Sequence, residues 1–139
     1  TQQYFPDFTL EPVLTWKTRI IHIKEVPSLS YIGYDRTYLT VKKSRIAIIP
    51  VGYWDGYDRL LSNNGQVHIQ DRLCPIRGRI AMNMTIIDIT ELPTAEVGQE
   101  VVLLGDYTGI TADDIAHRCL TINYEIVTRI NPLLPRILV

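Results

Sequence analysis

The tyrosines of this chain carry its most distinctive chemistry, because several lie in segments rich in glycine and charged residues. The chain has eight tyrosines in 139 residues. Tyr34 lies in the run Tyr34-Asp35-Arg36-Thr37-Tyr38, and Tyr53 lies in a second run, Gly52-Tyr53-Trp54-Asp55-Gly56-Tyr57. Glycine permits tight turns, and such turns expose phenol hydroxyls at a surface where they can bind a ligand or a partner. The residues alone leave two interpretations open: a binding surface, or ordinary turns whose tyrosine rings cover the edge of a core.

Other common catalytic and binding motifs are missing from the sequence. It contains no GxGxxG, Walker or G-x-S-x-G motif. His22, His68 and His117 lie far apart and lack metal-ligand spacing to cysteine, so we expect no metal site. Cys74 and Cys119 form no CxxC pair and indicate no disulfide framework, which favours a reducing, cytoplasmic setting.

Composition indicates one globular domain, with 46% hydrophobic residues and a formal net charge of −1. That charge gives no electrostatic reason to expect binding to nucleic acid or to an anionic membrane. No apolar run approaches the roughly 18 residues of a membrane span, and no signal-peptide pattern occurs. The chain begins at Thr1, and its first residues are polar and aromatic. We therefore expect a piece of a longer protein, with residues 1–11 as a linker or arm and residues 12–139 as the domain.

Hydrophobic patterning predicts a mainly β domain. Short β-like runs separated by Gly, Pro and Asn favour a barrel or sandwich over alternating βαβ units. Strands are expected at residues 16–24, 45–52, 66–70, 74–80, 85–89 and 100–104, with a closing strand at 136–139. Residues 62–65, Ser-Asn-Asn-Gly, are a strong turn signal. Thr111 is a good N-cap for a helix with Ile115, Cys119 and Leu120 on one face, and a second short helix is expected within 121–130.

Four short motifs follow one another along the chain. Residues 34–38 are similar to Y-G-x-T-[YF], and residues 48–57 to I-P-[IV]-G-Y-x-D-G-[YW]. Residues 78–83 are similar to G-R-[IV]-C-M-[DN], and residues 121–125 match T-I-N-Y-E. All four are motifs of the alanine racemase family, and they occur in the family's order. The resemblance covers about residues 12–139 and identifies the chain with the C-terminal domain of that family.

The resemblance implies a Greek-key-like β-barrel with one or two short helices near the C-terminus. In the family, an N-terminal TIM-like barrel carries the lysine that forms a Schiff base with pyridoxal 5′-phosphate (PLP). We therefore do not expect PLP on this piece alone. Family members are head-to-tail homodimers in which each site combines the lysine of one subunit with a tyrosine of the other. They interconvert L- and D-alanine by a two-base mechanism and supply D-alanine for peptidoglycan.

The resemblance also implies roles for particular residues. Tyr34 matches the catalytic base for the L-enantiomer. Met82 matches the residue whose backbone N–H meets the substrate carboxylate, and Tyr124 matches the tyrosine that reaches the cofactor phosphate. Tyr53, Arg79 and Asn83 match positions that line the substrate entryway. A phenol has an ordinary pKa of about 10 and is a poor base near pH 7 unless positive charge favours the phenolate. Because the family's barrel provides part of that charge, the isolated domain is expected to be inactive.

Each of these residues also has a purely structural interpretation. Tyr34 could cover a barrel edge, Tyr124 could pack a helix, Met82 could fill a core, and Arg79 could be an ordinary ion-pair partner.

Three positions depart from the family motifs. Asp35 stands where the family usually has glycine, and aspartate tolerates a positive φ better than most other residues. Ala81 replaces the common cysteine. Trp54 is bulkier than the usual residue and is expected to narrow or reshape the gate.

Two alternative functions remain. One is a serine racemase domain of the vancomycin-resistance type, whose N-terminal region is membrane-bound. The phenol of Tyr124 leaves less room for a hydroxymethyl group, which favours alanine. The other is a non-catalytic β-barrel module whose tyrosine-rich loops bind a protein partner, since tyrosine is common at interfaces.

Overall fold

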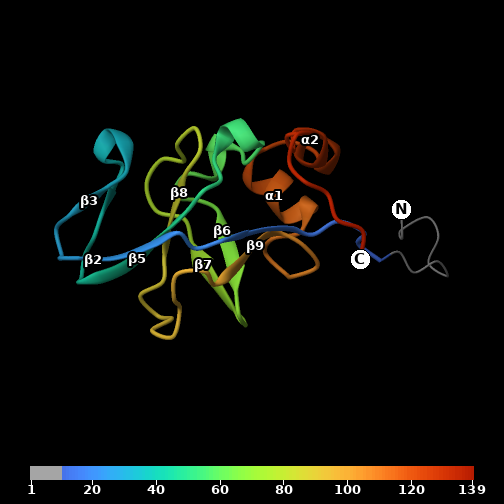
Figure 1. The fold of residues 1–139 in the computed structure, drawn as a ribbon. Helices are drawn as coiled ribbons and strands as arrows, with labels where there is room; N and C mark the ends of the chain where they lie inside the picture. The colour runs from blue at the N-terminus through green and yellow to red at the C-terminus, as the bar shows by residue number, and fades with distance from the viewer. Residues whose placement is uncertain (1–10) are drawn as a thin grey trace.

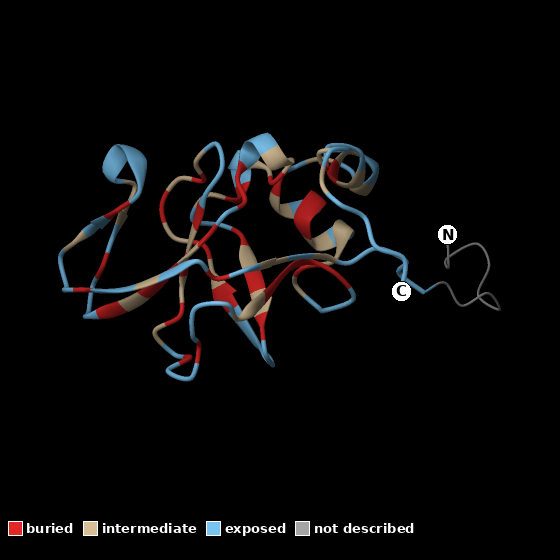
Figure 2. Ribbon diagram, in the orientation of Figure 1, coloured by how far each residue is buried: buried red, intermediate tan, exposed pale blue. Residues whose placement is uncertain are grey.

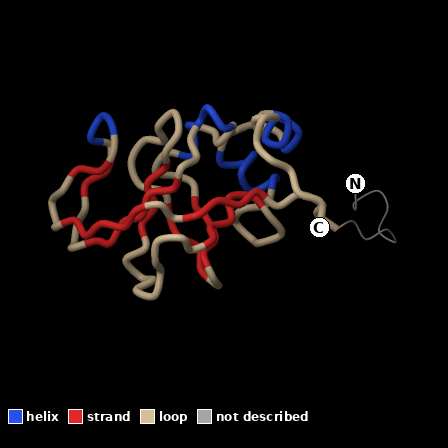
Figure 3. The backbone as a smooth tube through the Cα atoms, in the orientation of Figure 1, coloured by secondary structure: helices blue, strands red, loops and turns tan. Residues whose placement is uncertain are grey.

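The computed structural model describes residues 11–139, so the predicted arm lies almost wholly outside the described part. Strands run through the centre of the molecule and helical segments gather along one edge (Figures 1 and 3). In chain order the elements are β1 (Trp16–Arg19), β2 (His22–Val26), β3 (Tyr31–Ile32), η1 (Tyr34–Arg36), β4 (Tyr38–Leu39), β5 (Ser44–Ile49), η2 (Tyr53–Asp55), η3 (Arg59–Leu61), β6 (Gln66–Ile69), β7 (Arg72–Pro75), β8 (Thr85–Asp88), β9 (Glu100–Leu104), α1 (Ala112–Arg118) and α2 (Asn123–Thr128). The mainly β composition with two short helices near the C-terminus is confirmed.

The strands of residues 11–139 form three antiparallel sheets. One has the order β1-β9-β6-β7, the second β2-β5-β8, and the third is the small hairpin β3-β4. The predicted Greek-key-like closed barrel is not established by this pairing and stays a prediction.

The first predicted strand, residues 16–24, is two strands that belong to different sheets. The N–H of Ile20 donates to the carbonyl oxygen of Gln99 at 3.0 Å, and the next N–H, of Ile21, donates to that of Ile48 at 2.9 Å. Ile20 itself is buried. The chain thus passes from the first sheet to the second at this residue, and the buried Ile20 side chain packs in the core that residues of both sheets share.

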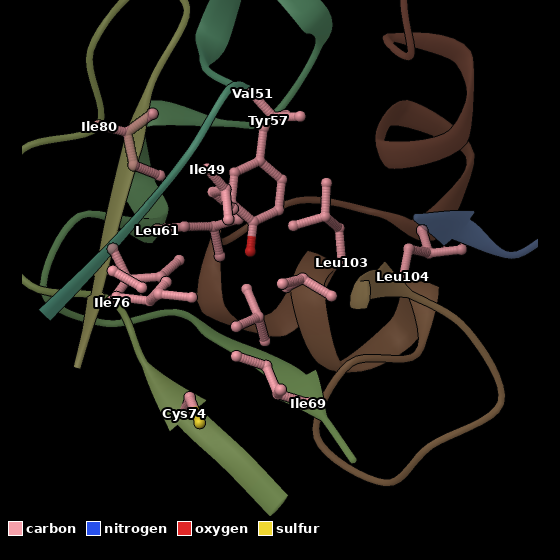
Figure 4. Close-up of a cluster of buried hydrophobic side chains, with 14 of the residues drawn as sticks. Ile49, Val51, Tyr57, Leu61, Ile69, Cys74, Ile76, Ile80, Leu103 and Leu104 are labelled. Carbon is pink, nitrogen blue, oxygen red and sulfur yellow. The ribbon is translucent and has the colours of Figure 1, made fainter. Parts of the chain in front are cut away.

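Buried aliphatic side chains from both larger sheets and the helices form the main core (Figures 2 and 4). In β5, Ile46, Ala47 and Ile49 are all buried, which agrees with the continuous β-branched run in the sequence. In β6 only alternate residues, Val67 and Ile69, are buried. Burial of each large aliphatic side chain stabilises the fold by about 1.5–3 kcal/mol.

The first helix begins as predicted, whereas the second, predicted at 121–130, spans only Asn123–Thr128, and both end earlier than predicted. The Thr111 side chain accepts a hydrogen bond from the Asp114 N–H, which confirms the predicted N-cap of α1. The Thr111 hydroxyl donates in return to the Asp114 carboxylate and lowers the pKa of that carboxyl. Leu120 does not lie on the apolar face of α1: the helix ends at Arg118, and Leu120 has φ 55° and is 92% exposed.

Two further predicted strands differ from the structure, and one hairpin was not predicted. The strand expected at 74–80 ends at Pro75, and Gly78, with φ 76°, cannot continue it. The closing strand expected at 136–139 is wrong, because these residues are exposed and have no strand partner among residues 11–139. The hairpin of β3 and β4 was not predicted, since strands of two residues leave no periodic pattern.

Tyr57 brings a polar atom into the centre of the core. Its ring packs edge-on against Trp16 at 5.7 Å between centroids, and the side chain is only 2% exposed. The hydroxyl points into the aliphatic cluster (Figure 4) and has no hydrogen-bond partner within residues 11–139. Burial raises the pKa of this phenol far above its ordinary value.

We expect Tyr57→Phe to stabilise the fold, because phenylalanine keeps the packed ring and removes the unpaired hydroxyl. The gain in the free energy of unfolding should be about 1 kcal/mol, the lower end of the usual penalty for a buried unpaired polar group. Urea unfolding at pH 7 measures it. Leu61→Ala, in the same cluster, should instead cost about 2–5 kcal/mol. A Tyr57→Phe variant that is less stable than the wild type would contradict this account.

The same phenol predicts a sensitivity to alkali. Above about pH 10 the Tyr57 phenol of the unfolded chain loses its proton, whereas the buried phenol of the folded chain keeps it. The free energy of unfolding is therefore unaffected by this group below that pH and falls as the pH rises above it. Relative to Tyr57→Phe, the wild-type free energy of unfolding should fall by up to about 1.4 kcal/mol for each pH unit above 10. If the free energies of unfolding of the wild type and of Tyr57→Phe change equally with pH, this prediction is wrong.

Candidate active site

Four segments that are distant in sequence lie along one edge of the molecule. They are the turn at η1 with Tyr34, the loop of residues 78–84, the loop of residues 50–57 that contains η2, and α2. In Figure 1 they follow one another along the upper edge, from the η1 turn above β3 to α2. Tyr34 and Tyr124 therefore lie toward opposite ends of this edge.

The Tyr34 turn is held by its backbone and by a neighbouring asparagine. Gly33, with φ 74°, lies so close to the 78–84 loop that a Cβ on it would be 3.1 Å from the Arg79 nitrogen. The Asn63 amide donates to the Thr37 hydroxyl at 3.1 Å, and its oxygen accepts from the Gly78 N–H at 2.6 Å. The predicted turn at 62–65 thus ties the Tyr34 turn to the 78–84 loop, a role that its local sequence does not reveal.

The loop that carries Tyr53 is bonded to the loop that carries Met82. The N–H of Tyr53 donates to the Ala81 carbonyl oxygen at 3.1 Å, and the N–H of Trp54 donates to that of Met82 at 2.9 Å. A Cβ on Gly52 would lie 2.2 Å from the Ala81 oxygen, so only glycine fits between these backbones.

The same Tyr53 loop fixes the position of α2. The N–H of Asn131 donates to the Asp55 carbonyl oxygen at 3.0 Å. Arg129, just after α2, pairs with the carboxylate of Asp58 at 2.8 Å and also with Glu125. Tyr124 on α2 is thereby held beside the Tyr53 loop.

The side chains that this edge presents are open to solvent. Tyr34 is 68% exposed, Tyr124 72% and Met82 55%, and Tyr53 and Asn83 are also exposed. The hydroxyls of Tyr34 and Tyr124 make no hydrogen bond with any residue of 11–139, nor does the N–H of Met82. The edge therefore offers two phenols and a peptide N–H as groups able to bind or to exchange protons.

Asp35 lies between two arginines next to Tyr34. One of its carboxylate oxygens is 3.6 Å from Nε of Arg79 and 3.9 Å from Nη2 of Arg59. No motif in the sequence connects Arg59 with the site, because only the folded loops bring it near residue 35. Asp35 has φ 60°, so its backbone takes the left-handed conformation that aspartate tolerates.

Comparison with known proteins identifies the family of this chain. Residues 13–138 match the family described as alanine racemase, C-terminal domain. This chain belongs to the alanine racemase family. The alanine racemase of Halothermothrix orenii is 55% identical over 129 residues, 91% of this chain and 34% of that protein. The alanine racemase of Leptospira interrogans is 50% identical over 135 residues, 96% of this chain and 35% of that protein.

Solved alanine racemase structures share the fold. The enzyme of the D-cycloserine producer Streptomyces lavendulae aligns with a TM-score of 0.87 and 38% identity, over 92% of this chain and 34% of that one. The Bartonella henselae enzyme, solved with covalently bound pyridoxal phosphate, aligns with a TM-score of 0.79 and 29% identity, over 84% of this chain and 32% of that one. This chain thus spans about a third of the alanine racemases that it matches.

The four alanine racemase motifs coincide with the four segments of the edge. The structure brings the turn that carries Tyr34 against Arg79 and the loop that carries Tyr53 against the loop that contains Met82 and Asn83, while Tyr124 follows on α2. The roles that the resemblance implies for these residues stay predictions.

Two lysines and both cysteines outside this edge are paired or buried. Lys17 and Lys42 hydrogen-bond to Glu100 and Glu91, which raises the pKa of each lysine and does not suit a Schiff-base nucleophile. Cys74 and Cys119 are free and buried, and burial raises the pKa of each thiol to about 11. Residues 11–139 contain no group of three or more possible metal ligands. None of their helices has the length and apolar character of a membrane span.

We expect Gly52→Ala to destabilise the edge, because the new methyl group meets main-chain atoms that cannot rotate away. Gly52 has φ −145°, which alanine adopts freely, so the cost of about 1–3 kcal/mol would come from overpacking alone. Urea unfolding measures it. Gly105→Ala is the matched control: its nearest neighbour, at 3.2 Å, is a Val102 methyl group, and the loss should be under about 1 kcal/mol. Equal losses in the two variants would contradict the account.

Proposed function

We propose that this chain is the C-terminal domain of an enzyme that interconverts L- and D-alanine with PLP, and that Tyr34 is one of its two bases. The observation that carries the proposal is the exposed Tyr34 hydroxyl, which has no partner within residues 11–139 and lies on a turn braced from two sides. The enzyme would act in the cytoplasm and provide D-alanine for peptidoglycan.

Racemisation needs a base on each face of the substrate. A proton must leave one face of Cα, and another must arrive on the opposite face. A single side chain cannot easily reach both faces of a planar carbon, so two groups flank it. The Tyr34 side chain would act as the phenolate: it would take the proton from L-alanine, become the neutral phenol, and return the proton in the reverse direction. The second base would be a lysine outside this chain.

The free donors on this edge fit the anionic groups of PLP and of alanine. The Tyr124 hydroxyl would donate to the cofactor phosphate, and the N–H of Met82 would donate to the substrate carboxylate. Both donors lack a partner within residues 11–139. When bound, PLP withdraws the electrons left at Cα after the proton departs.

Tyr53, Arg79 and Asn83 would line the path to this site. Asn83 follows Met82 in the 78–84 loop, Tyr53 is hydrogen-bonded to that loop, and the Arg79 guanidinium would attract the carboxylate of incoming alanine.

An edge this open requires a second surface to exclude water, and we propose the barrel domain of a partner subunit in a homodimer. Apolar side chains on or beside the edge, Trp54, Leu60, Met84 and Ile122, are exposed in this chain. Exposed apolar groups of this kind mark interaction surfaces. Each subunit would thus lend Tyr34 to the site of the other.

Tyr34→Phe in the full-length protein should lower kcat for L-alanine by about 10²–10⁴-fold, because phenylalanine keeps the ring and removes the hydroxyl that transfers the proton. Tyr31→Phe is the matched control, since Tyr31 is also exposed and lies in the preceding strand. The rate of D-alanine formation measures both. If Tyr34→Phe racemises alanine at the wild-type rate, Tyr34 is not a base and the non-catalytic interaction module becomes the better account.

A further inference from the structure

We infer that Asp35 is a positioning residue, whose carboxylate clamps the Tyr34 turn to Arg79 and Arg59 and so holds the Tyr34 hydroxyl in its working orientation. The inference rests on the proposed function, because the orientation matters only if Tyr34 acts on a substrate.

The Tyr34 turn has a backbone conformation that requires outside support. Gly33, Asp35 and Arg36 have φ values of 74°, 60° and 51°. For the two residues that are not glycine, the left-handed conformation is unfavourable. Such a turn persists only where surrounding contacts hold it.

The Asp35 carboxylate supplies such contacts. It reaches Arg79, which follows Gly78, and Arg59, which begins η3, at 3.6 and 3.9 Å. A single exposed ion pair contributes little, but one carboxylate shared by two arginines from separate segments restrains all three. Arg36 adds a contact of its own, with its guanidinium carbon 5.6 Å from the centroid of the Tyr31 ring.

The buried nitrogen of Arg79 makes the clamp stronger than an exposed pair. Nε of Arg79 is shielded from solvent and makes no hydrogen bond within residues 11–139, and the Asp35 carboxylate lies 3.6 Å from it. A charge that is shielded from solvent is screened less than an exposed one, so removal of this carboxylate would leave the Arg79 guanidinium without the negative charge that Asp35 supplies. The backbone of Arg79 also packs against Gly33. Arg79 therefore holds the turn at two points, through its main chain and through Asp35.

The test uses the full-length racemase with four variants. Asp35→Asn keeps a residue that tolerates the left-handed conformation and removes the charge. Asp35→Glu keeps the charge, so it should rescue the clamp. Asp106→Asn makes the same change of charge at an exposed residue far from Tyr34 in sequence, and Tyr34→Phe tests the proposed base itself.

Asp35→Asn should lower kcat for L-alanine about three- to tenfold with KM changed less than twofold, because misplacement of a base affects the transition state more than substrate binding. Asp35→Glu should keep at least half of the wild-type kcat, and Asp106→Asn all of it. Hydrogen exchange measured by mass spectrometry should accelerate in residues 31–39 of Asp35→Asn and in no other segment.

Two results would overturn the inference. In the first, Asp35→Asn has the kcat and the hydrogen exchange of the wild type while Tyr34→Phe is inactive. This result would leave the proposed function intact. The other is an equal loss of kcat in Asp35→Asn, Asp35→Glu and Asp106→Asn. If Tyr34→Phe is active, the proposed function fails instead. If hydrogen exchange of residues 31–39 is then also unchanged in Asp35→Asn, the clamp is excluded as well.

Discussion

Contact between backbones at two glycines is the constraint on which this edge depends. Gly33 lies against Gly78 and Arg79, and Gly52 lies against Ala81 and Met82. At both places a side chain would meet main-chain atoms, which cannot move aside as a side chain can. The 78–84 loop is therefore held between the Tyr34 turn and the Tyr53 loop. Strand β8, which follows this loop, pairs with β5 in the core, so the rigid part of the fold sets the position of the edge.

The parts of the fold that were predictable are those with a strong local signal. The β-branched run of β5 and the Thr111 N-cap were predicted, because burial and capping act over a few residues. The passage between sheets at Ile20 was not, since the alternating pattern continues through it and only the partner strands change. Residues 136–139, Arg-Ile-Leu-Val, resembled a strand, but a strand also needs a neighbour, and the sequence does not reveal whether one is present.

In the candidate site, too, some residues could be predicted from the sequence and others could not. Motif resemblance selected Tyr34, Tyr53, Met82 and Tyr124, and the fold places the segments that carry them on one edge. It could not select Asn63 or Arg59, whose contacts with Thr37 and Asp35 join positions more than 20 residues apart. Asp35 itself appeared only as a departure from a glycine motif. Its two arginine neighbours supply a physical reason why a residue other than glycine can occupy a left-handed position there.

The central claim is that one subunit lends Tyr34 to the active site of the other, and mixed dimers test it most directly. One subunit would carry Tyr34→Phe, and its partner would carry Tyr34 with the Schiff-base lysine of the N-terminal region replaced by alanine. Each homodimer should be inactive. If Tyr34 acts across the interface, the mixed dimer has one intact site, and we predict about half of the wild-type kcat per dimer. A mixed dimer that is as inactive as its two parents would contradict the account.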